Sequence, residues 1–477
     1  MNKLLYIALL ATCLMSCSDF LDIEDETKIS NDEIFTTLGG ASEAINGVYF
    51  ELSANDYYGV NMLVLPDLKG GNLKINDLTF EAPQSFNYIP SFEFSHTVEG
   101  DDDFAEDTYQ ELYEFINGVN NVVSNVDRIE DASEIEKAQI LAEAKALRAL
   151  AHFDLTRFYA QPYSYTANAQ HLGIPYLKTN VSFDEKTQRD LLFNNYEDMI
   201  SDLKYAEENL GTPIASEGAL YSKAYMTKLA AQALLARIYL YKNDWEKARV
   251  YASKVIEDGG VSLLSNSEVL SYYSNNTPTR EDIFILDKSG RNNGAVLSST
   301  IGLKEDRTSI YLTVSNDILD LYEDDDVRKQ LFGQQLERTI STKHIEFPGR
   351  KDHYASVIRL AEMYLIRAEA SLNLPVSDEV QARADLDIIR KRANPNAANL
   401  QLSGAALKEE LFLERRRELA FEGHLFFDIV RMGRDVRRVD CNALQNVNVD
   451  YPSNLFVLPI PEEAILYNDQ MVQNPGY

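Results

Sequence analysis

Long segments with helical periodicity, separated by stretches without it, set the strongest limit on the fold of this chain. Apolar residues that recur at intervals of three and four predict helices with one face buried against a neighbour. Pro162, Gly259 and Pro375 follow three of these segments, and proline and glycine are typical just after a helix end. The segments span residues 134–159, 223–242, 245–257, 354–373, 379–392 and 404–421.

Two of these segments form a helix pair with a repeat pattern. Residues 235–239 read Leu-Ala-Arg-Ile-Tyr, which resembles the Leu-Gly-x-x-Tyr core of a tetratricopeptide repeat with alanine in place of glycine. Ala248 follows Ala236 at the spacing where the second helix of that repeat has a small residue. Residues 134–210 and 354–392 show the same pairing less clearly. We therefore expect three or more stacked helix pairs that share one core.

Two long insertions without helical periodicity interrupt the predicted pairs. Residues 50–105 and 263–350 are rich in aromatic residues and in turn-forming glycine, proline and asparagine. Loops of this length inside a compact domain are usually binding loops or disordered, and their aromatic content argues against disorder. Short strands are predicted at Asp282–Asp287 and near Phe456–Pro459. We place the binding face of the protein on the two insertions.

Charge and cysteine content exclude some classes of protein. The 477 residues include 45 Lys and Arg against 75 Asp and Glu, which gives a formal net charge of −30. Binding to nucleic acid requires a dense basic surface, so no nucleic-acid partner is expected. Three cysteines cannot form a disulfide framework. Cys441 is interpreted as a small buried side chain rather than a nucleophile.

The N-terminal residues have the features of a bacterial lipoprotein signal. Residues 4–15 form an apolar run of the length of a signal-peptide core, too short to span a bilayer. Leu14-Met15-Ser16-Cys17 resembles a lipobox, in which the cysteine is acylated and becomes the new N-terminus. We predict a cleaved signal over residues 1–16, a lipid anchor at Cys17 and an acidic tether over residues 17–30. The alternative is a plain secretory signal with incidental cysteines.

Strings far apart in the sequence resemble one protein family. Residues 143–163 read EAKALRALAHFDLTRFYAQPY, residues 173–177 read GIPYL, and residues 233–241 read ALLARIYLY. Residues 414–431 read ERRRELAFEGHLFFDIVR, and residues 456–477 read FVLPIPEEAILYNDQMVQNPGY. Together with the lipobox, these strings resemble the SusD/RagB family of nutrient-binding outer-membrane lipoproteins from Bacteroidetes. The resemblance covers nearly all of the chain after the signal segment.

The resemblance implies both a fold and a function. The fold is mainly α, with tetratricopeptide-like helix pairs in a right-handed superhelical scaffold that carries long irregular loops and short β insertions. A single domain would span residues 31–477, with the scaffold at about 110–260 and 350–430. Such a protein is not an enzyme: it captures a glycan, or in some members a peptide, at the cell surface. It delivers this nutrient to a SusC-like, TonB-dependent β-barrel transporter. A helical-repeat scaffold for outer-membrane assembly, without a small ligand, is the other hypothesis.

A glycan ligand requires two kinds of side chain. Aromatic rings stack on the C–H faces of sugars, and polar groups bond to the hydroxyls. Trp245, the single tryptophan, begins a scaffold helix, so a broad tryptophan platform for helical starch is not expected. Each candidate taken alone is better explained by packing. We predict that at least two of these residues contact the ligand: Asp67, Asn72, Phe86, Tyr88, Phe92, Tyr272, Tyr273, Asn275 and Tyr311.

No cofactor is predicted from the motifs. Asp101–Asp103 and Asp324–Asp326 offer oxygen ligands for Ca²⁺, but neither continues with the glycine and glutamate of an EF-hand loop, so solvated charge runs are favoured. His424 and Asp428 lie four residues apart, and no third zinc ligand is evident.

The many acidic residues also invite a glycosidase hypothesis. Glycoside hydrolysis needs two carboxylates at a set separation, and no acid/base motif is recognisable in this helix-rich chain. Glutamates at 410, 414 and 418 alternate with the arginines at 415–417. This pattern predicts structural ion pairs on and between helices.

Overall fold

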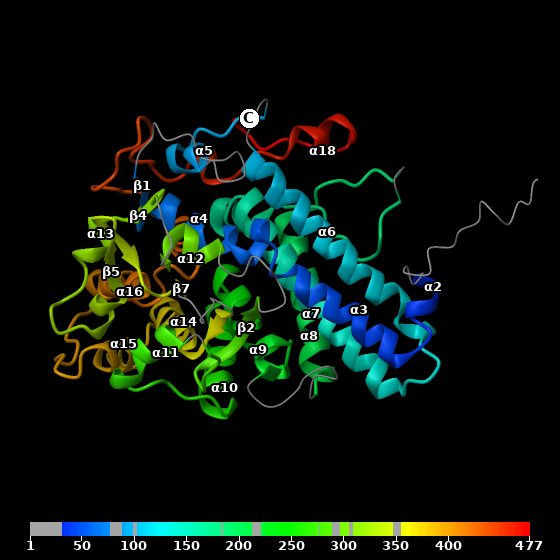
Figure 1. Ribbon diagram of the computed structural model, residues 1–477, viewed down its shortest axis with the longest axis horizontal. Helices are drawn as coiled ribbons and strands as arrows, with labels where there is room; N and C mark the ends of the chain where they lie inside the picture. Colours follow the sequence, from blue (N-terminus) through cyan, green and yellow to red (C-terminus); the bar gives the residue numbers. More distant parts are fainter. Residues whose placement is uncertain are drawn as a thin grey trace, which may run out of the picture.

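The computed structural model describes residues 31–76, 88–98, 103–182, 185–211, 221–275, 277–288, 296–304, 309–346 and 354–477. Over these residues the protein is mainly helical with a few short strands (Figure 1), which confirms the predicted fold class. The predicted signal segment, the lipid anchor at Cys17 and the acidic tether lie outside the described residues. Within the described residues, no helix is both long and apolar enough to span a membrane.

The first long helices pack side by side. Helix α3 (Leu38–Glu51) contacts α6 (Asp103–Asn125), and α6 contacts α7 (Glu134–Tyr159). A capping box starts α7: the Ser133 hydroxyl accepts a hydrogen bond from the Glu136 amide at 3.3 Å, and the Glu136 carboxylate accepts one from the Ser133 amide at 2.8 Å. The bounds of α7 are those predicted from the sequence.

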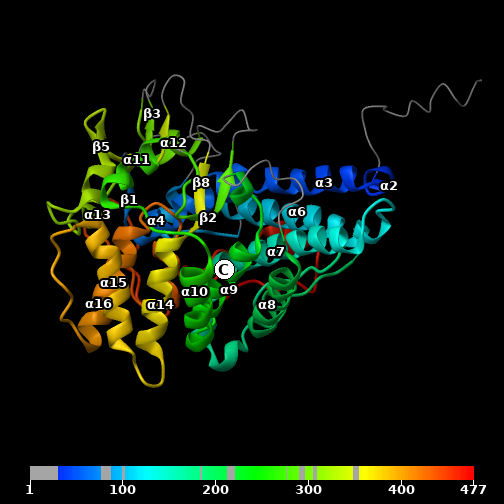
Figure 2. The ribbon, with the colours of Figure 1, turned by 90° about the horizontal axis from the view of Figure 1, so that it is seen from below.

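The helix pairs form one continuous array. Helix α7 packs against α8 (Leu192–Asn209), α8 against α9 (Lys228–Tyr241), and α9 against α10 (Trp245–Asp258). Helix α10 then contacts α14 (Leu360–Asn373), which contacts α15 (Glu379–Ala393) and α16 (Gly404–Glu418). Figure 2 shows this order from α7 and α8 on the right to α14, α15 and α16 on the left. The prediction of stacked pairs is confirmed.

Small residues allow the closest of these approaches. Ala236 of α9 and Ala248 of α10 are both completely buried, and the two helices are extensively packed. The Tyr239 ring stacks on the Tyr251 ring of α10, with centroids 5.6 Å apart. These contacts are the ones that the repeat pattern predicts for a tetratricopeptide-like pair.

Residues 354–359 form a strand, although the sequence pattern predicted a helix from 354 onwards. Strand β8 (Tyr354–Arg359) pairs antiparallel with β2 (Asp282–Asp287), the strand that was predicted. Because β8 finds a partner, its backbone groups bond to β2, and the helix begins only at Leu360. The strand predicted near Phe456–Pro459 was wrong: residues 454–456 form a short 3₁₀ helix, and the Leu458 amide donates to the carbonyl of Phe158.

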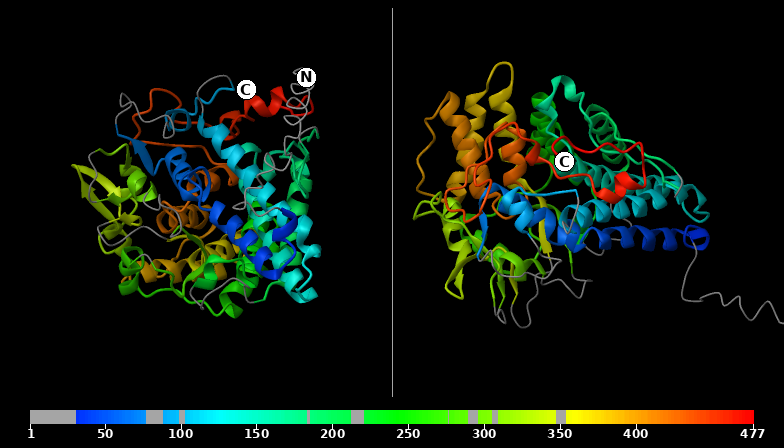
Figure 3. Two further views of the ribbon diagram at one scale, coloured as in Figure 1. Left: turned by 45° about the vertical axis from the view of Figure 1, so that its right-hand side comes forward. Right: turned by 90° about the horizontal axis from the view of Figure 1, so that it is seen from above.

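The other strands are short and gather on one side of the helix array (Figures 2 and 3). They form two antiparallel pairs and one parallel pair. The antiparallel pairs are β1 (Leu73–Ile75) with β4 (Leu312–Val314) and β5 (Phe332–Gln335) with β6 (Arg338–Ser341), and the parallel pair is β3 (Leu303–Lys304) with β7 (Ile345–Glu346).

The described part of the first insertion belongs to the core, contrary to the prediction of an irregular loop. Helix α4 (Asn61–Gly70) lies within it, and all ten of its residues are buried. A helix buried on every side shows no amphipathic pattern, and Pro66 in its middle further hides it from sequence analysis. The second insertion also contains a helix, α11 (Asn266–Asn275), before β2. Cys441, predicted to be buried, is half-buried and forms no disulfide.

Candidate functional site

A pocket opens beside strands β2 and β8, at the junction between the strands and the helix array. The space that it borders, including the open solvent at its mouth, measures about 520 Å³. Segments far apart in the sequence contribute its lining: Leu63, Tyr272, Tyr273, Thr277, Pro278, Asp282, Ile285, Lys343, His344, Tyr354, Ala355, Ser356, Phe421 and Glu422.

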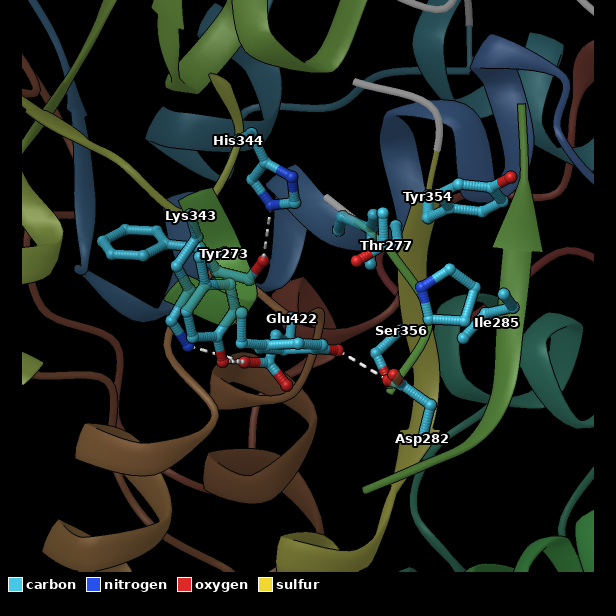
Figure 4. A pocket seen from close by; sticks show the side chains of 14 residues that line it. Tyr273, Thr277, Asp282, Ile285, Lys343, His344, Tyr354, Ser356 and Glu422 are labelled. Atoms are coloured by element: carbon cyan, nitrogen blue, oxygen red, sulfur yellow. Dashed lines mark hydrogen bonds and ion pairs between the residues drawn. The ribbon is translucent and has the colours of Figure 1, made fainter. Parts of the chain in front are cut away.

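Two adjacent tyrosines at the end of α11 form one wall of the pocket. The rings of Tyr272 and Tyr273 pack edge to face, with centroids 4.6 Å apart. The Tyr272 hydroxyl donates to Asp282 Oδ1 at 2.6 Å, and the Tyr273 hydroxyl donates to Glu422 Oε1 at 3.0 Å (Figure 4). Because both hydroxyls are bonded, the two rings are held in fixed positions.

Glu422 is a buried anion at the centre of the polar contacts. Lys343 Nζ donates to Glu422 Oε1 at 2.5 Å, and Arg359 Nε donates to Glu422 Oε2 at 2.6 Å. Burial alone would raise the pKa of Glu422, but Arg359 and Lys343 outweigh it and hold this pKa below its usual range. The carboxyl therefore stays ionised, and its oxygens hold Tyr273 and Lys343 in place.

The opposite side of the pocket carries a second carboxyl and a hydroxyl. Asp282 accepts hydrogen bonds from Tyr272, from the Thr279 amide at 2.7 Å and from the Thr279 hydroxyl at 2.9 Å. Burial raises the pKa of Asp282 above its usual value. Ser356 Oγ has no hydrogen-bond partner among the residues that the structure describes. Figure 4 shows Ser356 and Tyr354 across the pocket from Lys343 and Tyr273.

A cluster of buried ion pairs supports this site from behind. Glu418, at the end of α16, accepts hydrogen bonds from three arginines: from Arg328 at 2.9 Å, and from Arg359 and Arg392. Arg359 and Arg392 both also bond to Glu281, the residue before β2. The cluster joins α15, α16, β2 and β8, so it fixes the segments that carry the pocket residues.

The prediction that the alternating glutamates and arginines of α16 form structural ion pairs is confirmed. Arg415 bonds to Asp428 at 2.8 Å, and Arg417 bonds to Glu414 at 2.9 Å. Arg416 departs from the pattern, because its Nε donates to the Asn72 side-chain oxygen at 2.8 Å instead of pairing with a carboxylate.

Of the predicted ligand contacts, the structure brings Tyr272 and Tyr273 together in this pocket. Asn275 lies at the end of α11 and is exposed, but it does not line the pocket. Tyr311 is half-buried and stacks on Tyr88, with ring centroids 6.2 Å apart. Phe86 lies outside the described residues.

Four other predicted ligand contacts are buried in the scaffold, each with at most 1 % of its surface exposed. They are Asp67, Asn72, Tyr88 and Phe92. Asp67 Oδ1 accepts hydrogen bonds from the Phe421 amide at 2.9 Å and from the Asn72 side chain at 2.6 Å. These bonds connect α4 to the segment after α16. In this structure the four side chains have structural partners and no surface for a ligand, so the proposal below does not use them.

Sequence analysis missed most of the polar lining. Lys343 and His344 precede β7, and Ser356 lies in β8; both strands pair with partners distant in the sequence, which no local pattern reveals. Tyr354 was assigned to a helix, and Glu422 stood in the 414–431 string that carries the family resemblance. A partial signal did exist, because Asp282 opens the predicted strand directly after the aromatic segment.

The candidate metal ligands take part in other contacts. Asp428 bonds to Arg415 and Arg431, and His424 is buried beside this pair with its pKa well below the usual value because of burial and the nearby arginines. Asp324 pairs with Lys329 at 2.6 Å. Among the described residues, no group of three or more His, Cys, Asp or Glu side chains is placed to hold a metal ion.

The array of helix pairs and the tyrosine-lined pocket place this protein in the class of helical-repeat proteins that carry a binding pocket. Comparison with known sequences identifies the family within this class. Residues 322–477 match the SusD family, and residues 20–240 match a family described as starch-binding and associating with the outer membrane. The chain belongs to the SusD/RagB family.

Individual relatives agree with this assignment. SusD-like protein P2 of Formosa agariphila is 25% identical, over 100% of this chain and 99% of its own length. A SusD superfamily protein of Bacteroides thetaiotaomicron superposes with a TM-score of 0.81 at 26% identity, over 92% of this chain and 100% of that one. A SusD-like carbohydrate binding protein of Bacteroides vulgatus, 21% identical, shares the fold with a TM-score of 0.76 over 91% and 97% of the two chains.

Proposed function

We propose that this protein binds a glycan nutrient in the pocket between α11 and the β2–β8 pair. Its family includes a group described as starch-binding, and a protein of the same fold is described as carbohydrate binding. In this proposal the pocket receives one or a few sugar units of a longer chain, and the protein binds them without chemical change.

The pair of tyrosines beside a polar rim carries the proposal. Tyr272 and Tyr273 present aromatic surface whose orientation is fixed by bonds to Asp282 and Glu422. Aromatic rings with a fixed orientation can stack on the C–H face of a sugar without a large loss of side-chain entropy. Lys343 supplies donors and the carboxylates supply acceptors for the sugar hydroxyls.

The carboxylates of the pocket suit binding better than hydrolysis. A glycosidase needs one carboxyl to give up a proton and a second to act as a nucleophile or base. Glu422 is bonded to Tyr273, Lys343 and Arg359, and Asp282 accepts three hydrogen bonds from its neighbours. Because both groups already have protein partners, we propose that the protein is not an enzyme.

We further propose that the protein works at the outer membrane with a SusC-like, TonB-dependent transporter. The family match to a group that associates with the outer membrane supports this placement. The sequence before the described residues supports it too, because the lipobox-like segment at Leu14–Cys17 predicts an acylated N-terminus. The helical array would then hold the pocket outside the membrane, where glycans arrive.

Calorimetric titration with a panel of oligosaccharides and short peptides tests the binding proposal. We expect at least one oligosaccharide to bind, and Tyr273→Ala to weaken that binding several-fold to about tenfold, because a stacking ring contributes on the order of 0.5–1.5 kcal/mol. Asn275→Ala is the matched control, since Asn275 lies on α11 but outside the pocket lining. If only peptides bind, the proposed ligand is a peptide and the glycan proposal is wrong. Release of reducing sugar would contradict the proposal that the protein is not an enzyme.

A further inference from the structure

The charged side chains around the glycan pocket bear on which sugars it accepts. Its lining contains two carboxyl groups, Asp282 and Glu422, and two basic side chains, Lys343 and His344. His344 is buried, and its Nε2 lies 3.4 Å from the carbonyl oxygen of Phe421, so this ring nitrogen faces the protein (Figure 4). Lys343 is therefore the lining cation on which an acidic ligand would depend.

The charge of Lys343 is already matched inside the protein. Its Nζ donates to Glu422 Oε1 at 2.5 Å and to the carbonyl of Glu418 at 3.2 Å. The same atom lies 4.9 Å from the centre of the Tyr273 ring, and the side chain is only 5 % exposed. An acidic group on a ligand would have to compete with Glu422 for this ammonium group and would lie beside the Glu422 carboxylate while doing so.

The ion-pair cluster behind the pocket adds no unmatched positive charge. Each of its three arginines bonds to two or more carboxylates. The arginines are Arg328, Arg359 and Arg392, and they share the carboxylates of Glu281, Asp326, Glu414, Glu418 and Glu422. Carboxylates therefore outnumber guanidinium groups in this cluster.

One more cation lies near the pocket, and it too has protein partners. Lys223 Nζ donates to the carbonyl of Thr279 at 2.9 Å and to the carbonyl of Asp282, the residue whose carboxyl lines the pocket. Over a longer range, the formal net charge of −30 gives the approach to the protein a negative potential. Near and distant charges therefore oppose an anion in the same direction.

We propose that the pocket selects uncharged sugar units and rejects units that carry a carboxylate or a sulfate. This inference rests on the proposed glycan binding at the same pocket and adds the class of sugar. An acidic unit against Tyr273 would lie beside Asp282 and Glu422, and the lining lysine that could offset them is already paired. The hydroxyls of a neutral unit can instead donate to both carboxyl groups without repulsion.

Matched trisaccharides separate the effect of charge from the effect of shape. The panel contains maltotriose, cellotriose, mannotriose and galactotriose, each in its neutral form, its C6-oxidised carboxylate form and the methyl ester of the oxidised form. Calorimetric titration near pH 7 and about 20 mM salt measures all of them. We expect at least one neutral trisaccharide to bind, its carboxylate form to bind at least about tenfold more weakly, and the uncharged methyl ester to bind within about threefold of the neutral form.

Salt and one substitution test whether the repulsion comes from the pocket. Raising the salt to about 500 mM should narrow the gap between the carboxylate and neutral forms, because the repulsion is screened. Asp282→Asn should strengthen binding of the carboxylate form relative to the neutral form about threefold or more, because it removes one of the two lining carboxyl groups. Glu246→Gln is the matched control: it removes one charge from an exposed position at the start of α10 and should leave the ratio unchanged.

The outcomes distinguish this inference from glycan binding itself. A carboxylate form that binds as tightly as its neutral form, or a methyl ester that binds as weakly as the carboxylate, would contradict selection by charge and leave the glycan proposal standing. Equal effects of Asp282→Asn and Glu246→Gln would also contradict it, since the repulsion would not come from the pocket. If Asp282→Asn does not fold, the salt dependence of the unmodified protein gives the same test. If no member of the panel binds, glycan binding is itself contradicted, and the selection with it.

Discussion

Tyr88 and Tyr273 are the same type of residue but differ in burial: one ring lies in the core and the other borders the pocket. Tyr88 is 1 % exposed and packs between Phe104 and Tyr311, with ring centroids 6.0 Å and 6.2 Å away. Tyr273 is half-buried, and its ring borders the pocket while its hydroxyl bonds to Glu422. The first ring stabilises the core, and the second is placed where a ligand can reach it.

Truncating the two rings should therefore affect different properties. We expect Tyr88→Ala to lower the free energy of unfolding by about 3–5 kcal/mol, because it leaves a cavity in a packed core. Tyr273→Ala should cost clearly less stability and reduce glycan binding instead. Urea unfolding of both variants, followed by circular dichroism, measures the first effect. Equal losses of stability would show that Tyr273 is also a core residue.

Asp67 gives the core a pH dependence of defined sign. Burial raises the pKa of its carboxyl to about 6 from a usual value of 3.8, and Oδ2 has no hydrogen-bond partner among the described residues. The folded protein therefore binds this proton more tightly than the unfolded chain. The stabilising contribution is complete below pH 3.8 and is lost as the pH rises through about 6.

The variant Asp67→Asn removes this titration. Relative to the variant, the wild-type protein should lose about 2 kcal/mol of unfolding free energy between pH 4 and pH 7, since one pKa unit corresponds to about 1.4 kcal/mol. Urea unfolding of both proteins across this range measures the difference. A difference that stays constant with pH, or changes with the opposite sign, would contradict the raised pKa.

At the scale of elements, buried ion pairs join the strands to the helices near the pocket. Glu418 accepts bonds from Arg328, Arg359 and Arg392, all at most 7 % exposed at the side chain. Burial alone would raise the pKa of Glu418, but the three arginines hold it well below its usual value. The Glu418 carboxylate, shared by three buried guanidinium groups, therefore connects α16 to α15 and β8.

Glu418→Gln should be strongly destabilising, because it leaves buried arginines without their full complement of negative charge. We expect a loss of about 3–5 kcal/mol in the free energy of unfolding, the usual effect of breaking a buried ion pair. Asp450→Asn, which breaks the exposed pair with Arg437, is the control and should leave stability nearly unchanged. Similar small effects for both variants would show that the buried cluster contributes little.

Helices α7 and α10 could be predicted from the sequence because their strong helix formers and helix-end residues are local signals. Helix α7 begins at its capping box and α10 begins at Trp245, as the pattern indicated. Helix α4 escaped because it is only ten residues long and has Pro66 in its interior, and β8 was assigned to a helix because its partner β2 lies far away in the sequence. A helix or strand that depends on a distant partner cannot be recognised from the few residues around it in the sequence.

The same reasoning explains which pocket residues were among the predicted candidates. Tyr272 and Tyr273 were selected because adjacent aromatic residues in an irregular stretch are visible in the sequence. Lys343, Ser356 and Glu422 were missed because three separate segments bring them to the same place. Sequence analysis also selected Asp67 and Phe92, since it could not distinguish a polar or aromatic residue in a loop from one in the core.

At the scale of the whole molecule, a helix array carries short strands on one side, and the candidate glycan pocket lies where the two meet (Figure 2). The array gives a rigid frame, and the residues that border the pocket come from its attached segments. This division suits a capture protein, which needs a stable frame and variable binding residues.

The predicted lipid anchor can be tested on the whole protein in its native membrane. We expect Cys17→Ala to move the protein from the membrane fraction to the aqueous fraction, because the acyl chains supply the membrane affinity. Cys441→Ala is the matched control and should leave the distribution unchanged. Retention of the Cys17→Ala protein in the membrane fraction would contradict an anchor at this residue.

The most direct test of the central claim is a crystal structure of the protein with the oligosaccharide that binds most tightly in the calorimetric panel. The account predicts a sugar ring against Tyr272 or Tyr273, with hydroxyls bonded to Lys343 or Glu422. Clear density for the oligosaccharide elsewhere, with this pocket empty, would contradict it.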